Sequence, residues 1–377
     1  TLSTSSAASD VYKRQAERTE FPLKQLALSL AVHLAPRRLR LGKAVGMPIL
    51  EIGQSILAGC KRSTHLARVY TVTAIKDLDE EHEHVSTGQH VDDVSNLAVG
   101  DDDKQLINNA VKYAVHFADA MKRLRMTISN KSMVVPASKA ATRIAEILRS
   151  VGIPMKCEKT GVDIGVDTNS AAGPRTTVKQ QDRLNEGSKK ANKCETLTRR
   201  NAAVRRAAIT GVVPTQDYGF TAIGMAPTSV NKAASNVAKA TGLMAAGTCR
   251  SAVLRWAFRT SRYRNESADP RVTIPARQIK SWTELWNRCP AELQERIRKA
   301  WVMSLAKLSK AKGMWQCVKG PITAAIATLI GVGWKPVDPV GWVTSESCGQ
   351  SESNNASSKQ IACFTETQGH AVKQVLH

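Results

Sequence analysis

The amino-acid sequence predicts an α+β fold: helices around a short antiparallel sheet, followed by a long region of basic helices. Over much of the chain, apolar residues recur at every third or fourth position, which is the period of an amphipathic helix. Residues 160–167 instead alternate apolar and polar side chains, and residues 84–99 fit two short strands around a polar turn. From residue 175 onward, lysine and arginine dominate the polar positions of the helical stretches.

The first part of the chain carries three predicted helices. Residues 23–34 form a short apolar stretch that ends before Pro36, and residues 63–81 place an apolar side chain at about every third position. Residues 104–126 carry the longest continuous apolar stripe, so we expect this helix to be the strongest of the three.

The predicted strands lie between and after these helices in the sequence. Residues 84–89 and 94–99 predict a hairpin with a turn at Asp92 and Asp93. Further along, residues 131–135 favour a strand, residues 138–151 a helix with Gly152 just past its end, and residues 160–167 another strand.

Basic helices make up the second half of the chain. Residues 175–206 contain ten lysines and arginines but only three acids, which predicts a long helix or a helix pair with a cationic outer surface. Residues 250–312 are again basic and helical. The two ends, residues 1–19 and 344–377, have no hydrophobic period, so we expect a non-native or disordered leader and a disordered tail.

The overall charge indicates a polyanionic partner. The 377 residues include 54 lysines and arginines against 32 acids, a net charge of +22. Basic side chains bind nucleic acids by displacing the counterions condensed on the phosphates. A large surplus of positive charge therefore favours nucleic acid as the ligand.

The cysteines and the apolar runs predict an intracellular protein. None of the eight cysteines forms a C-x-x-C pair, so they indicate small apolar residues in a reducing compartment. No signal peptide is visible, and the most apolar run, residues 322–332, is shorter than the roughly 20 residues of a membrane span. We expect a nuclear and cytoplasmic protein that is not secreted and has no membrane partner.

Acidic residues are concentrated in one segment. Residues 76–103 contain ten acids and one lysine, which is the arrangement that a metal-dependent phosphoryl-transfer site needs inside a cationic protein. Asp92 and Asp93 can approach a common ion only at a hairpin tip, because neighbouring strand residues face opposite sides. The alternative is an ordinary solvated turn. For Asp101, Asp102 and Asp103 we expect helix capping, since they precede the strongest helix.

The order of several motifs resembles reverse transcriptases. H-V-D-D at residues 90–93 resembles the x-x-D-D box of their palm, and S-I-L-A-G-C-K-R-S at 55–63 is similar to the loop before it. S-N-K-S-M-V-V at 129–135 is similar to the lysine-bearing strand, and I-G-V at 164–166 to the primer-grip hairpin. V-V-P-T-Q-D-Y-G at 212–219 resembles the segment after the thumb. The likeness covers residues 21–260 and is strongest to non-LTR, LINE-like elements of protists.

This resemblance implies a right-hand polymerase organisation. Residues 20–170 would form a partial palm, residues 171–245 a thumb-like basic helical domain, and residues 246–343 a helical basic C-terminal region. The implied activity is RNA-directed DNA polymerisation, with an RNA template, a DNA primer and deoxynucleoside triphosphates as partners.

The resemblance also implies roles for single residues. Asp92 would bind Mg²⁺, with Mn²⁺ as a substitute, and Asp93 would be its partner near the primer terminus. Lys131 would lie near the incoming triphosphate. The template loop would include Gly59, Cys60 and Ser63. The nucleic-acid contacts of the thumb would come from its basic residues: Arg183, Lys189, Lys190, Lys193, Arg199, Arg200, Arg205 and Arg206.

The chain departs from the family pattern in three places. His90 stands where the family usually has an aromatic residue, and Ala58 where the loop usually has glutamine. Two-metal catalysis also needs a third carboxylate from a separate strand. The only aspartate before residue 22 is Asp10, which has no strand pattern around it, so we expect this chain to be inactive on its own.

The sequence is also consistent with two other functions. A basic nucleic-acid-binding protein without catalysis would account for the net charge alone. A metal-dependent nuclease would use the acids together with a nearby histidine, for which His82, His84 and His90 are the candidates.

Overall fold

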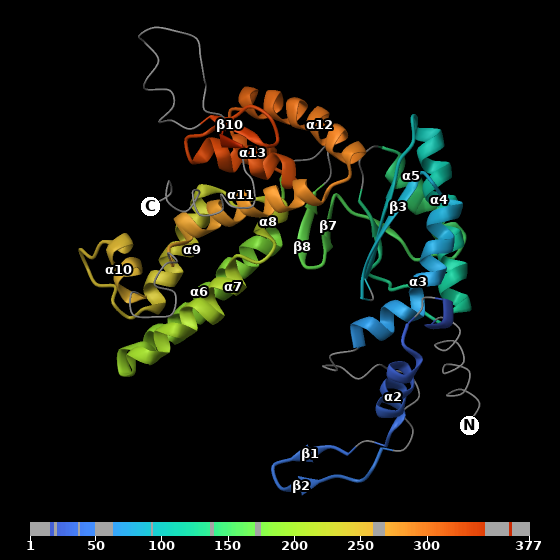
Figure 1. Ribbon diagram of the computed structural model, residues 1–377, viewed down its shortest axis with the longest axis horizontal. Helices are drawn as coiled ribbons and strands as arrows, with labels where there is room; N and C mark the ends of the chain where they lie inside the picture. Colours follow the sequence, from blue (N-terminus) through green and yellow to red (C-terminus); the bar gives the residue numbers. More distant parts are fainter. Residues whose placement is uncertain are drawn as a thin grey trace. The chain divides into compact units, whose positions relative to one another are not determined.

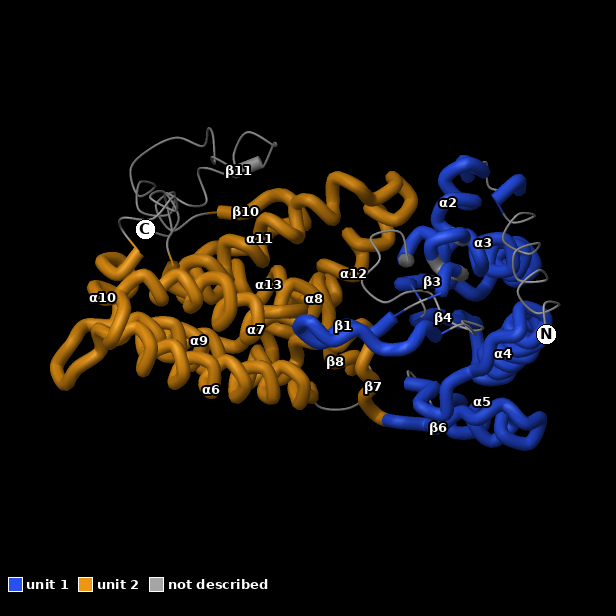
Figure 2. Tube along the Cα trace, turned by 90° about the horizontal axis from the view of Figure 1, so that it is seen from below, with its two compact units in different colours: residues 1–158 blue, residues 159–377 orange. Residues whose placement is uncertain are grey.

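The structure is a computed structural model and describes residues 16–18, 21–36, 38–49, 63–91, 93–135, 139–169, 175–258, 268–343 and 362–363. It is an α+β protein, mostly helical, with small and mainly antiparallel sheets (Figure 1). The chain divides into two compact units, residues 1–158 and residues 159–377 (Figure 2). The predicted leader and tail lie outside the described residues, apart from residues 16–18 and 362–363.

Unit 1 contains four longer helices and three strand pairs within its described part. The helices are α2 (Leu23–Leu34), α3 (Ser63–Glu81), α4 (Asp103–Arg123) and α5 (Ala140–Ser150). The strands are β1 (Arg40–Leu41), β2 (Ala44–Val45), β3 (Val85–His90), β4 (Asp93–Ala98), β5 (Met133–Val134) and β6 (Lys156–Cys157). The predicted helices at 23–34 and 63–81 and the predicted hairpin are confirmed.

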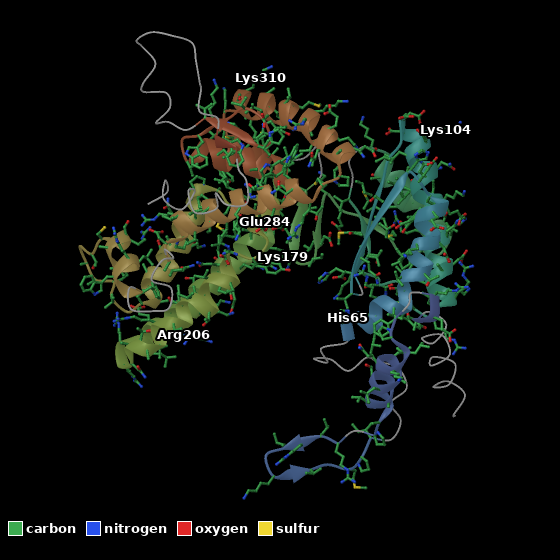
Figure 3. The ribbon with its side chains drawn as sticks, viewed as in Figure 1. His65, Lys104, Lys179, Arg206, Glu284 and Lys310 are labelled. Atoms are coloured by element: carbon green, nitrogen blue, oxygen red, sulfur yellow. The ribbon has the colours of Figure 1, made fainter. Side chains whose placement is uncertain are left out.

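The helices α3 and α4 form the framework on which the hairpin lies. They run in opposite directions, since His65 in the first turn of α3 and Lys104 in the first turn of α4 lie at opposite ends of the pair (Figure 3). The core between these helices and β3 consists of Leu78, Val85, Tyr113, Ala120 and Met121. Burial of this apolar surface is the main force that holds the hairpin in place.

Two predicted elements of unit 1 are shorter than expected. The strand predicted at 131–135 is reduced to Met133–Val134, which pairs in parallel with β6, because residues 129–132 form a turn closed by the Ser132 N–H and the Ser129 carbonyl. The helix predicted at 138–151 begins at Ala140, and Gly152 follows its end with a φ of 81°. Glycine adopts this left-handed conformation without strain.

Unit 2 is built mainly of helices. These are α6 (Val178–Arg200), α7 (Val213–Gln216), α8 (Phe220–Ile223), α9 (Pro227–Ala240), α10 (Arg250–Ala257), α11 (Pro270–Arg288), α12 (Ala291–Lys310) and α13 (Pro321–Gly331). Shorter turns at Ala202–Arg205, Ala208–Val212 and Met314–Cys317 connect them. The strands are β7 (Thr160–Asp163), β8 (Val166–Asn169), β9 (Lys335–Pro336), β10 (Gly341–Val343) and β11 (Ala362–Cys363).

A tryptophan-rich core stabilises the C-terminal part of unit 2. Trp282 and Trp301 pack at 5.3 Å between ring centroids, and Trp334 stacks on Trp342 at 6.1 Å. The most apolar run of the sequence forms α13, which is buried in this core. None of the helices in the described part of the chain is long and apolar enough to cross a membrane.

The stretch predicted as a single strand at 160–167 is a hairpin. β7 pairs with β8 in antiparallel register, from Thr160 opposite Asn169 to Asp163 opposite Val166, around a turn at Ile164 and Gly165. The hairpin packs on α6 and α8 and belongs to unit 2.

Candidate functional site

The tip of the β3–β4 hairpin is the first candidate site. His90 pairs with Asp93, so only Val91 and Asp92 separate the two strands in the sequence, one residue earlier than the predicted turn. Asp92 lies outside the described residues. Val91 has a φ of 59°, a conformation that a β-branched residue adopts only under strain. Strain of this kind clusters at ligand-binding and active sites, where the surrounding structure maintains it.

A side chain of β3 connects the turn to the framework helix α3. The Gln89 amide donates to the Val91 carbonyl at 2.9 Å and to the Thr71 hydroxyl at 2.6 Å, and Thr71 is buried on α3. On the same face of β3, the Thr87 hydroxyl is 2.7 Å from the Tyr113 hydroxyl on α4. The inner face of the hairpin is therefore fixed to both helices close to its tip.

The Asp93 carboxylate is accessible to a ligand. It is exposed on the outer face of β4 and makes no hydrogen bond or ion pair with any described residue. The β3–β4 sheet has two strands, and no third described strand pairs with it. The oxygens of Asp93 are thus free to bind a cation.

The other predicted residues of unit 1 do not join this site in the described structure. Lys131 is exposed in the turn before β5, and no ion pair connects it to Asp93. Ser63 is the first residue of α3, whereas Gly59 and Cys60 lie outside the described residues. The capping role of Asp102 is confirmed, because its carboxylate accepts the Gln105 N–H at 2.7 Å.

The histidines near the acids are placed differently from one another. His82 is buried, His84 is exposed beside Glu83 at 3.5 Å, and His90 lies opposite Asp93. The described part of the chain therefore brings no two of these three histidines together with a carboxylate. His82 instead meets His116 and Glu81, a cluster that no sequence spacing predicted. Burial lowers the pKa of His82, and the Glu81 carboxylate opposes this shift.

The second candidate site is the outer face of α6. Its buried positions, Gln180, Leu184, Gly187, Ala191 and Thr198, follow the helical period. Gly187 is needed there, because an added Cβ would lie 3.0 Å from the Cβ of Gln216. The cations predicted to bind nucleic acid lie outside this stripe: Lys189, Lys193, Arg199, Arg200 and Arg206 are exposed, and Arg183, Lys190 and Arg205 are half-buried.

Several of these cations are held in position by the rest of unit 2. The Arg183 guanidinium lies 4.2 Å from the ring centroid of Tyr218, and the Lys190 ammonium donates to the Thr215 hydroxyl at 2.7 Å. Arg205 donates to the Thr241 carbonyl at 3.1 Å. Others are neutralised, because Arg199 pairs with Glu195 at 2.7 Å and Lys189 with Glu186 at 3.8 Å.

Three cations remain available on this face of α6 and just beyond its end. Lys193, Arg200 and Arg206 make no ion pair with any described residue. An open groove with a volume of about 610 Å³ lies at the N-terminal end of α6. Its lining combines basic, acidic and polar side chains: Lys179, Asp182, Arg183, Asn185, Glu186, Lys189, Pro214, Thr215 and Tyr218.

The direction of α6 is fixed by an acid from the neighbouring hairpin. Asp167 on β8 is buried, and its two oxygens accept the N–H groups of Lys179 and Gln180, each at 3.1 Å. These N–H groups have no partner inside the helix, so the carboxylate caps it and interacts favourably with the helix dipole. The start of the basic helix is therefore anchored to β8.

Comparison of the chain with protein-family models, curated protein sequences and solved structures found no match. The two candidate sites are defined by their own geometry: a free carboxylate beside a strained hairpin tip, and a long cationic helix face.

Proposed function

We propose that this chain is a nucleic-acid-binding part of a phosphoryl-transfer enzyme. More specifically, we propose that it belongs to an RNA-directed DNA polymerase of the non-LTR, LINE-like reverse transcriptase type. The observation that carries the proposal is the β3–β4 hairpin, whose two-residue turn precedes the free carboxylate of Asp93. A metal-dependent polymerase needs acids that are unpaired in the protein and fixed in position.

The proposed role of the hairpin is to hold one side of a magnesium site. Mg²⁺ prefers oxygen ligands and retains several waters, so it binds through one or two carboxylates plus substrate phosphates. In the proposed site these carboxylates are Asp92 and Asp93. A two-metal mechanism requires a further carboxylate that bridges both ions, so the hairpin acids alone are not sufficient for catalysis.

The proposed role of α6 is to bind the phosphates of the template–primer duplex. Lys179 at the start of α6 and Arg206 beyond its end lie at opposite ends of this basic element in Figure 3. A helix of 23 residues is about 35 Å long, close to one turn of a nucleic-acid duplex. Lys193, Arg200 and Arg206 supply positive charge that no described acid neutralises.

Metal binding tests the role of the hairpin. Because Mn²⁺ substitutes for Mg²⁺, electron paramagnetic resonance can measure the free Mn²⁺ in a titration, and the number of bound ions follows by difference. We expect weak Mn²⁺ binding that is lost in Asp93→Asn and in Asp92→Asn. Asp102→Asn is the matched control, since Asp102 caps α4 and should leave Mn²⁺ binding unchanged. Equal loss at Asp93 and Asp102 would contradict the proposed site.

Primer extension tests the catalytic part of the proposal. We expect that the 377-residue chain alone does not extend a DNA primer on an RNA template. Of the three carboxylates that two-metal catalysis needs, the sequence supplies only the two hairpin acids at the matching positions. Extension that Asp93→Asn abolishes would overturn the expectation that the chain alone is inactive and would mean that another acid occupies the third position, for which residues 77–83 are the first candidates to substitute. Extension that Asp93→Asn leaves intact would refute the assignment of the hairpin.

A second candidate function, nucleic-acid binding without catalysis, is favoured by the exposed cations of α6. Its test is the dependence of duplex affinity on salt. We expect the combined Lys193→Ala, Arg200→Ala and Arg206→Ala substitutions to reduce the log–log salt slope by about 2 to 3 units. The control removes three exposed lysines of unit 1, Lys76, Lys104 and Lys122, and should change the slope less. If these substitutions reduce the salt dependence of duplex affinity and the hairpin binds no Mn²⁺, this second function is favoured.

A further inference from the structure

We propose that Glu81, His82 and His116 form a binding site for a divalent transition-metal ion, and that Zn²⁺ is the ion it fits best. This site is independent of the proposed polymerase function. Glu81 is the last residue of α3, His82 follows it, and His116 lies in the middle of α4. One donor atom from each of the three residues lies within 4.8 Å of the other two.

His116 Nδ1 lies next to both of the other donor atoms. His82 Nε2 is 3.0 Å from His116 Nδ1, and His116 Nδ1 is 3.0 Å from Glu81 Oε1. A ring nitrogen carries either one proton or one lone pair. His116 Nδ1 can therefore satisfy both neighbours only by sharing one proton between them. A metal ion bound by all three atoms gives each lone pair its own partner.

The donor set selects the class of metal. Two imidazole nitrogens and one carboxylate oxygen suit Zn²⁺ and related transition metals, whereas Mg²⁺ prefers oxygen alone. Zinc binds nitrogen and oxygen donors at about 2.0 to 2.2 Å, which places the donors of a tetrahedral site about 3.3 Å apart. The two donor pairs that lie 3.0 Å apart need a small outward movement to reach this spacing, and the donors of Glu81 and His82 lie within 4.8 Å of each other. With three protein ligands, the fourth position is left for solvent.

The packing around the site holds the imidazoles in place. His82 is buried, and its ring meets the ring of Tyr113 edge-on at 5.4 Å and that of His116 at 4.9 Å. The His82 carbonyl accepts the N–H of Val85, the first residue of β3. A bound ion would therefore cross-link the end of α3, the start of β3 and the middle of α4.

The site is separate from the acids at the hairpin tip. The tip follows the other end of β3, and a six-residue strand spans about 20 Å. Because the two sites use different residues, Glu81→Gln and His116→Asn report metal binding at the base of the hairpin, and Asp93→Asn reports it at the tip.

The test is titration of the tag-free, metal-depleted full chain with Zn²⁺ and with Co²⁺, whose visible spectrum reports tetrahedral coordination. We expect one ion to bind with micromolar or tighter affinity, with a rise in the midpoint of thermal unfolding. His116→Asn, which retains a polar group near the position of Nδ1, and Glu81→Gln should each weaken binding at least tenfold. The matched control is His84→Ala, because His84 is exposed and lies outside the cluster.

The absence of Zn²⁺ binding to the unmodified chain would overturn the proposal. So would unchanged affinity in both Glu81→Gln and His116→Asn, or an equal loss of affinity in His84→Ala. If His116→Asn does not fold, Glu81→Gln decides the question, since Glu81 is exposed and its substitution leaves the packing of His82 intact.

Discussion

The two longer hairpins of this protein share a design and differ in how they use their acids. In each, the first strand is followed by a β-branched residue at positive φ: Val91 at 59° after β3 and Ile164 at 47° after β7. In both, a side chain donates a hydrogen bond to the carbonyl of that residue, from Gln89 at 2.9 Å and from Tyr218 at 3.1 Å.

The acids that follow the two turns have opposite surroundings. Asp167 is 4% exposed, and both of its oxygens are occupied by N–H groups of α6. Asp93 is exposed and has no partner among the described residues. A carboxylate whose hydrogen bonds are complete stabilises the fold, whereas one without partners is available to a ligand. This difference is the physical reason for assigning a structural role to one hairpin and a binding role to the other.

The largest expected effect is the loss of stability on removal of Asp167. Asp167→Ala leaves two N–H groups at the start of α6 without partners, so we expect unit 2 to lose about 2 to 3 kcal/mol of unfolding free energy. All seven tryptophans of the chain lie in unit 2, so their fluorescence during urea unfolding reports this unit alone.

The paired substitution, Asp93→Ala, should change stability by less than about 0.5 kcal/mol, because an exposed side chain without partners is removed. Hydrogen exchange of peptides from α4 measures the stability of unit 1, which contains no tryptophan. A similar loss in both variants would mean that the two acids do not differ as their surroundings indicate.

The sequence predicted those features that depend on neighbouring residues. The apolar period identified the helix at 63–81 with its observed bounds, and the polar turn between short strands identified β3–β4. The capping role expected of the acidic triplet at 101–103 is confirmed for Asp102, because capping is a local property. These features follow from backbone geometry within a few residues.

Features that depend on tertiary contacts were not predicted. Residues 160–167 alternate through Val162, Ile164 and Val166, and an isoleucine at positive φ gives no signal of a turn. The structure tolerates it because the Ile164 carbonyl is held by Tyr218, 54 residues away. His116 likewise lies 34 residues from His82, and only the packing of α3 against α4 brings them together.

The second-largest expected effect is the relief of backbone strain at the two turns. Val91→Gly and Ile164→Gly each remove a β-branched residue from a left-handed conformation, so we expect each to stabilise its unit by about 1 kcal/mol. Their effects on metal binding should differ. Val91→Gly should weaken the binding of Mn²⁺, because glycine allows the tip more conformations, whereas Ile164→Gly should leave it unchanged. If Val91→Gly stabilises unit 1 and binds Mn²⁺ as before, the strain at Val91 does not contribute to the site.

The smallest expected effect separates the two roles of Tyr218. Its hydroxyl donates to the Ile164 carbonyl, and its ring carries the Arg183 guanidinium at 4.2 Å. Tyr218→Phe removes only the hydroxyl. Since Tyr218 is 47% exposed, water can replace that hydrogen bond, and we expect unit 2 to lose no more than about 0.5 kcal/mol with unchanged duplex affinity.

Tyr218→Ala also removes the ring, and with it the cation–π contact that holds Arg183 at the edge of the α6 groove. An exposed contact of this type contributes about 0.5 to 1 kcal/mol, so we expect duplex affinity to fall between twofold and fivefold. Fluorescence anisotropy of a labelled RNA–DNA duplex resolves changes of this size at fixed salt. If both variants bind as the unmodified chain does, Arg183 does not contact the duplex, and the nucleic-acid surface is limited to the exposed cations farther along α6. If Tyr218→Phe alone already weakens binding, the conformation of the β7–β8 turn contributes to recognition, and the second hairpin has a binding role as well as a structural one.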